Sequence, residues 1–147
     1  QGVMVRVEDK DKYTSVESFK DAMLGAQKGA IQVGIAKKQV KGMADDTQDN
    51  PQVKELPKLG DLVLALKNKS IDAVIVEVGV AQAYAKANAD LVVAPVVFVD
   101  ETGGSSIAIK KGNAALLAAV NKTLARLAET KAIDTFVADA SVLMDQL

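Results

Sequence analysis

The sequence predicts an α/β domain with a mainly parallel sheet flanked by helices, followed by further helices at the carboxyl end. Three observations carry this prediction. Strand-like and helix-like patterns alternate along residues 3–109, and such alternation is typical of parallel sheets. The run Ala73–Val76 is short, apolar and rich in β-branched residues, as expected for a strand covered on both faces. Residues 113–147 have a helical pattern, with expected breaks near Thr130 and Ala140.

The amino-terminal half supplies the first elements. Alternating valines predict a strand over residues 3–7. Ser15 is a candidate N-cap for a short helix that extends to Met23. A short strand is expected over residues 24–27 and a helix over residues 30–40, before a polar loop that contains proline and glycine.

The remaining elements follow in the same alternating order. Val53–Leu56 is a candidate strand, and Leu59–Lys67 has the apolar side of an amphipathic helix. Further along the chain are the buried run at residues 73–76, a helix at 80–87, a β-prone run at 91–99 that Pro95 interrupts, and a strand at 105–109.

The composition is that of an ordinary globular domain, and it narrows the chemistry. The 147 residues are 49% hydrophobic and 25% charged, with a net charge of −1, so we expect no binding to nucleic acid. Cysteine and histidine are both absent, which removes thiol chemistry and the commonest general base and metal ligand. No apolar run approaches the roughly 20 residues of a membrane helix, and no signal-peptide pattern opens the chain. We expect no cofactor, no metal and no catalytic residue.

A glycine turn before the helix at residues 30–40 is the first candidate binding element. Gly29 lets the backbone approach a ligand closely. The N–H groups of Ala30, Ile31 and Gln32 would start the helix, where they favour an anion such as a carboxylate. The alternative is a plain tight turn without a ligand, as a lone glycine often forms. The segment is not a P-loop, because the spaced glycines and the terminal Lys-Ser/Thr are missing.

Glu77 is the second candidate, at the carboxyl end of the strand at residues 73–76. Open α/β sheets hold ligands at that edge. The carboxylate can bind an ammonium group through charge-assisted hydrogen bonds, or it can be a solvated cap of the next helix. Gly29 and Glu77 follow neighbouring candidate strands, so together they offer donors for an anion and an acceptor for a cation. Such a pair suits a zwitterion, for example an amino acid.

Two further groups of charges carry less information. The loop residues Asp45, Asp46 and Asp49 have oxygen atoms of the kind that Ca²⁺ prefers, but they lack EF-hand spacing, and a solvated loop is the favoured interpretation. Five lysines are interpreted as solvated helix and loop faces: Lys37, Lys38, Lys41, Lys54 and Lys58.

Several segments, in their order along the chain, resemble the second half of the extracellular solute-binding proteins of polar amino-acid ABC transporters. These proteins form bacterial solute-binding family 3 and have the type II periplasmic-binding-protein fold. The resembling segments are SVESFK at 15–20, QKGAIQ at 27–32, LVLALK at 62–67, DAVIVE at 72–77 and SIAIKKG at 106–112, followed by a helical stretch at 116–132.

The resemblance implies one lobe of that fold over residues 1–111, with C-terminal helices over residues 112–147 that would pack on a first lobe absent from this chain. Two crossing strands, near residues 3–7 and 107–110, would join the lobes. In the family, the segment that matches residues 29–32 binds the ligand α-carboxylate.

The position that matches Glu77, usually aspartate, binds the ligand α-amino group in the family. The family often has Ser or Thr where this chain has Ala30 and Ile31, so hydroxyl donors are lost here while the backbone N–H groups remain.

The resemblance also implies a function. The parent protein would capture a polar amino acid between two lobes and deliver it to a permease, in an extracellular or periplasmic location. A signal or lipoprotein precursor, a lipid anchor or a fused permease would tie it to the membrane. Two alternatives stay open on the same fold: a ligand-sensing domain of a receptor or kinase, and a dehydratase-like enzyme in which Glu77 would be the general acid.

The C-terminal helices carry apolar faces that need cover, and a large uncovered face marks an interface. We expect either a homodimer that swaps these helices or docking onto the chain's own sheet. The residues of these faces are Leu116, Leu117, Val120, Leu124, Leu127, Phe136, Val137 and Leu143.

Overall fold

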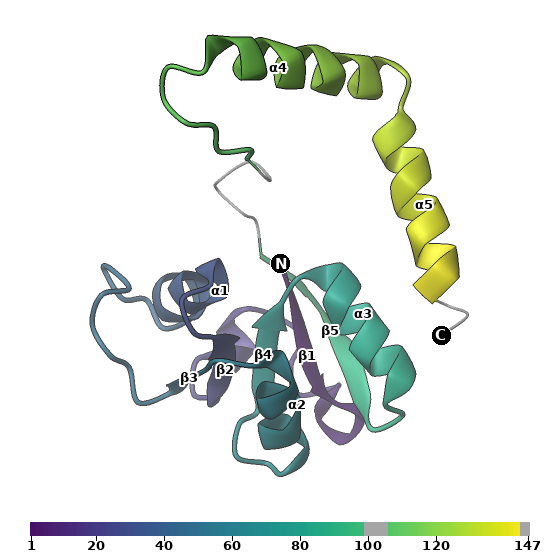
Figure 1. The fold of residues 1–147 in the computed structure, drawn as a ribbon. Helices are drawn as coiled ribbons and strands as arrows, with labels where there is room; N and C mark the ends of the chain where they lie inside the picture. Colours follow the sequence, from purple (N-terminus) through teal and green to yellow (C-terminus); the bar gives the residue numbers. More distant parts are fainter. Residues whose placement is uncertain (99–105, 145–147) are drawn as a thin grey trace. The chain divides into compact units, whose positions relative to one another are not determined.

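The computed structural model describes residues 1–98 and 106–144. The chain divides into two compact units, Gln1–Glu101 and Thr102–Leu147, which are described separately below (Figure 1). This division lies ten residues before the expected boundary between residues 111 and 112.

Within the described part of unit 1, five strands form one sheet in the order β3-β2-β4-β1-β5. Strand β2 pairs in parallel with β3 and β4, whereas β1 pairs antiparallel with β4 and β5. Four strands therefore share one direction and β1 opposes them, which confirms the predicted mainly parallel α/β sheet. The strands are β1 Gly2–Arg6, β2 Leu24–Gln27, β3 Val53–Leu56, β4 Ala73–Val76 and β5 Leu91–Val97.

Helices cover both faces of the sheet, so β1 and β4 are buried along their whole length. One core joins side chains such as Val5 and Ile75 with Phe19 and Ile35 from one helical layer. The other core joins Met4 and its neighbours with α2 and α3, which cross the sheet in Figure 1. The helical segments are η1 Val7–Asp9, η2 Glu17–Phe19, α1 Ile31–Gly34, the π-helix η3 Ile35–Val40, α2 Leu59–Lys67 and α3 Val78–Ala87.

Strand β5 continues through Pro95, where the sequence pattern suggested an interruption. Proline lacks an N–H donor, but an edge strand needs ladder bonds on one side alone, and β5 is at the edge of the sheet. The cost appears as a register shift, because Gly2 pairs with Val97 while Met4 pairs with Val93. Val99, at the end of the expected run, lies outside the described residues.

Several expected elements differ from the structure. Residues 106–110 form no strand, so the expected strand at 105–109 is wrong over its described part; no described strand pairs with it to supply hydrogen bonds. Near Ser15 the helix is a single 3₁₀ turn without a side-chain capping hydrogen bond, and the Ser18 hydroxyl inside that turn donates to the Ser15 carbonyl at 2.6 Å. The expected break at Ala140 is absent.

Close packing at the sheet centre requires a glycine. A Cβ at Gly25 in β2 would lie 2.6 Å from Ile71 Cδ1 and 2.9 Å from Leu62 Cδ2. Helix α2 and the turn after it therefore approach β2 more closely than any other residue would permit.

Arg6 makes several contacts at the edge of the sheet where the parallel strands β2 and β4 begin. Its guanidinium donates to the carbonyls of Leu66 and Ile71 at 2.8 and 2.7 Å. It also pairs with Asp9 at 2.6 Å and Asp72 at 3.3 Å. Asp72 in turn accepts a 2.8 Å hydrogen bond from the amide of Met23. One buried cation thus joins the ends of β1 and α2 to the starts of β2 and β4.

Lys41 is tied to the backbone rather than solvated. Its Nζ donates to three carbonyl oxygens, of Phe19, Lys20 and Ala22, at 3.1, 2.7 and 2.6 Å. Burial lowers the pKa of Lys41. This lysine, like Lys37 below, corrects the interpretation of the whole lysine set as solvated faces.

Unit 2 contains two helices, α4 Ala114–Glu129 and α5 Ala132–Met144, in its described part. Asn113 caps α4 by accepting from the Leu116 amide at 3.1 Å, and the expected break near Thr130 is confirmed. No residue of α4 is buried. Large apolar side chains are exposed on both helices, up to 61% for Phe136: Leu116, Leu117, Leu124, Ile133, Phe136 and Val137. The side chain of Leu143 lies outside the described set.

Within the described residues, no helix combines the length and the apolar character that a membrane span requires.

Candidate functional site

The turn after β2 has the geometry expected of a close-approach site. The strand ends at Gln27, and Gly29 then adopts a positive φ of 76°. A Cβ at Gly29 would meet no atom within 4 Å, so backbone conformation rather than space explains the glycine. Ala30 follows as the extended N-cap of α1.

Two of the three expected amide donors are available. The Ala30 N–H is already used, because it donates to the Gln27 carbonyl at 3.0 Å. Among the described residues the N–H groups of Ile31 and Gln32 have no partner. These are the unpaired donors that the first turn of a helix leaves open.

Glu77 lies at the same edge of the sheet. Strands β2 and β4 are parallel neighbours, with Leu24 opposite Ala73, so their carboxyl ends meet there. Glu77 is the N-cap residue of α3, but its side chain makes no capping hydrogen bond. The carboxylate is exposed and accepts a 3.0 Å hydrogen bond from Gln32 Nε2. The structure therefore brings the glycine turn and Glu77 together through Gln32.

Gln32 makes a second contact that the sequence did not suggest. Its Nε2 also donates to Gln1 Oε1 at 2.8 Å. The Gln32 side chain is buried, with the residue 4% exposed. In Figure 1 the start of the chain lies at the edge where β4 ends and α3 begins.

A pocket of about 380 Å³ opens beside the glycine turn. Lys37 lines it with a side chain that is 4% exposed, paired with Glu55 Oε1 at 2.9 Å and donating to the Asp46 carbonyl at 3.2 Å. The buried ion pair explains why Lys37 is not a solvated surface residue. The lining residues are Gly29, Ala30, Val33, Gly34, Lys37, Asp46, Thr47, Asp49 and Glu55.

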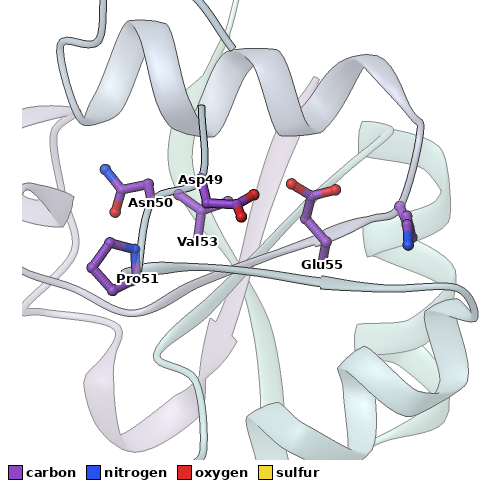
Figure 2. A pocket seen from close by; sticks show the side chains of 6 residues that line it. Asp49, Asn50, Pro51, Val53 and Glu55 are labelled. Carbon is purple, nitrogen blue, oxygen red and sulfur yellow. The ribbon is translucent and has the colours of Figure 1, made fainter. Parts of the chain in front are cut away.

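A second pocket, of about 460 Å³, shares Asp49 and Glu55 with the first (Figure 2). Its other lining residues are Lys28, Asn50, Pro51 and Val53. Neither of these two pockets includes Glu77.

The acidic loop is organised by its own hydrogen bonds. Asp45 accepts from the Thr47 hydroxyl at 2.6 Å and from the Thr47 amide at 2.9 Å. These bonds lower the pKa of Asp45, because they favour the ionised carboxylate. Across residues 1–98 and 106–144, no group of three or more acidic side chains is placed to hold a metal ion.

Comparison with solved structures shows what the fold resembles. An amino acid ABC transporter substrate-binding protein from Streptococcus pneumoniae, bound to L-arginine, is 33% identical to this chain with a TM-score of 0.76. The match covers 97% of this chain and 57% of that protein. This chain has the fold of an amino-acid ABC-transporter substrate-binding protein. The resemblance expected from the sequence is thereby confirmed.

Two further structures agree. A second S. pneumoniae substrate-binding protein bound to L-arginine is 27% identical with a TM-score of 0.79, and the match covers 96% of this chain and 56% of that protein. An ancestral arginine-binding protein bound to glutamine is 26% identical with a TM-score of 0.71, and the match covers 94% of this chain and 57% of that protein. The chain thus spans somewhat more than half the length of these proteins. A scan of protein-family models gives no match, and no curated protein is significantly similar in sequence.

Proposed function

We propose that this chain is the ligand-binding second lobe of an amino-acid ABC transporter's substrate-binding protein, and that its sheet edge holds the backbone of a polar amino acid. The N–H groups of Ile31 and Gln32, at the turn that Gly29 forms, would bind the α-carboxylate, while Ala30 shapes the turn. The carboxylate of Glu77 would bind the α-ammonium group.

One observation carries the proposal: unpaired amide donors and an exposed carboxylate lie at adjacent strand ends and are connected by the 3.0 Å bond from Gln32 to Glu77. Donors at a helix start favour an anion, and a carboxylate favours an ammonium group. A free amino acid carries both charges. Similar proteins solved with L-arginine and with glutamine support this class of ligand.

The parent protein would then capture its ligand by closing two lobes and deliver it to a permease. It would act outside the cytoplasm of a bacterium, in an extracellular or periplasmic location, tied to the membrane by a lipid anchor or a fused permease. The similar solved proteins are named as transporter components, not enzymes, which supports a binding role without turnover.

Calorimetric titration of this chain with a panel of amino acids, including L-arginine and L-glutamine, tests the proposal. We expect heat with a polar amino acid and none with its decarboxylated or deaminated analogue at the same concentration. Equal heats for the amino acid and both analogues would contradict recognition of the zwitterion.

The exposed apolar faces of α4 and α5 support a second proposal, that isolated copies of this chain pair through these helices. We expect light scattering to report a dimer, and the double variant Leu117→Ser, Phe136→Ser to shift it toward monomer, because apolar interface area is lost. Lys122→Ser is the matched control on α4. If the unsubstituted chain stays monomeric over the accessible concentration range, this pairing is contradicted.

A further inference from the structure

The side-chain amide of Gln32 is already hydrogen-bonded within the protein, so it is not a free donor for a ligand. Its residue is 4% exposed, and its amide nitrogen lies between two acceptors, Gln1 Oε1 at 2.8 Å and Glu77 Oε1 at 3.0 Å. A carboxamide nitrogen has two N–H donors. Both donors are therefore used before any ligand arrives.

This arrangement fixes the orientation of the Gln32 amide. If the amide were rotated by half a turn, its oxygen would face two other oxygen acceptors and both hydrogen bonds would be lost. An unpaired polar group in a buried position is costly, so the two acceptors select one orientation. Glu77 is consequently held at one oxygen, Oε1, and no described residue is bonded to its other oxygen.

Gln1 is itself anchored. Its carbonyl accepts from the Phe98 amide at 2.8 Å, and its nitrogen donates to the Phe98 carbonyl at 3.0 Å. Gly2 pairs with Val76 in the antiparallel ladder of β1 and β4, so extension of that register places Gln1 opposite Glu77. The contact from Gln1 through Gln32 to Glu77 thus connects the residue before β1, helix α1 and the residue after β4.

We infer that Gln32 is a positioning residue for Glu77: its buried amide, held in place by Gln1, orients the carboxylate so that the free oxygen receives the ligand ammonium group. A glutamate side chain has several rotatable torsions, and ordering them at the moment of binding weakens affinity. A carboxylate that is already oriented avoids this cost. The inference rests on the proposed function, because it assigns the ammonium group to Glu77.

The test uses the full chain and the variants Gln32→Met, Gln1→Ala and Glu77→Ala, with Gln52→Met as the matched control. Gln52 Nε2 also makes a hydrogen bond, to the Asp21 carbonyl, but at an exposed position. Met keeps the length of Gln without its polar atoms. Thermal unfolding of each variant verifies that it is folded at the temperature of the binding experiment.

The first readout needs no ligand. In a ¹⁵N–¹H spectrum we expect the Gln32 side-chain amide to give two well-separated, slowly exchanging proton signals. Gln1→Ala should move one of them and Glu77→Ala the other, while Gln52→Met moves neither. A Gln32 amide with the shifts and exchange of a solvated side chain would overturn the inference.

The second readout compares L-arginine with 5-guanidinopentanoate, the same molecule without its α-amino group. We expect Gln32→Met to weaken binding of L-arginine about tenfold, as for the loss of a hydrogen bond to a charged group, and to leave the deaminated analogue unchanged. Equal weakening of both would mean that Gln32 supports the fold or another part of the ligand, which overturns the inference. If the unsubstituted chain binds neither molecule, the proposed function is contradicted for these probes. The side-chain amide signals of Gln32 still decide whether Gln32 is hydrogen-bonded to both Gln1 and Glu77.

Discussion

Glu77→Ala is expected to weaken binding of a polar amino acid such as L-arginine by about 10- to 100-fold. A hydrogen bond to a charged group typically contributes about 1.5–3 kcal/mol, and this substitution removes the acceptor of the ligand ammonium group. In this chain the lost partner is the carboxylate of Glu77, the residue after β4, which accepts from Gln32. The fold should be unaffected, since the Glu77 side chain is exposed and makes no capping bond to α3.

Calorimetric titration of the variant and of two companions measures this effect. Glu77→Gln keeps the shape but loses the charge, so it should be nearly as impaired as Glu77→Ala. Glu17→Ala removes an exposed carboxylate from η2 and should bind as the parent does. Undiminished binding by Glu77→Ala would remove Glu77 from the site. The same variants address the enzyme alternative, in which Glu77→Gln would abolish turnover of a carboxylate substrate.

Arg6→Met is expected to lower the free energy of unfolding by about 3 kcal/mol, more than any other single substitution proposed here. Arg6 is buried against the carbonyls of Leu66 and Ile71, and it pairs with three carboxylates, those of Asp9, Asp72 and, at 3.6 Å, Glu8. Removal of one partner from a buried ion pair leaves the other charges and carbonyls unpaired and typically costs about 3–5 kcal/mol. The value expected here is at the low end, because the carboxylates of Asp9 and Asp72 retain contact with water.

Thermal and urea unfolding followed by circular dichroism measures the change. A loss of about 3 kcal/mol corresponds to a Tm lower by roughly 10 °C. Lys69→Met is the matched control, because Lys69 makes an exposed ion pair with Glu8 at 2.8 Å, and such pairs contribute little to stability. An Arg6→Met protein as stable as the Lys69→Met protein would show that the buried network does not hold together the edge where β2 and β4 begin.

Much of the fold follows from local pattern. Ala73–Val76 forms a central strand that is covered on both faces. A strand in that position needs apolar side chains on both faces, and the continuous apolar run therefore predicts it directly. Features decided by distant partners could not be predicted in this way. Pro95 remains in a strand because β5 lies at an edge of the sheet. Residues 106–110 are β-prone but form no strand among the described residues, because propensity alone does not supply a hydrogen-bonding partner.

The candidate site divides in the same way. Parallel pairing of β2 and β4 brings Gly29 and Glu77 to one sheet edge, and that adjacency could be predicted from the order of the elements. The roles of Gln1 and Lys37 could not, since both depend on contacts across the fold. Lys37 lies among helix residues that read as a solvated face, and its burial follows from Glu55 on β3, eighteen residues further along the chain.

We propose above that this sheet edge alone can hold an amino acid by both of its charges. Backbone amide shifts of the ¹⁵N-labelled chain, recorded during titration with L-arginine, test it most directly. We expect saturable shifts concentrated at Gly29, Ile31, Gln32 and Glu77, and we expect them to be lost in Glu77→Ala. Saturable shifts confined to the pocket around Asp49 and Glu55, or to the C-terminal helices, would contradict it.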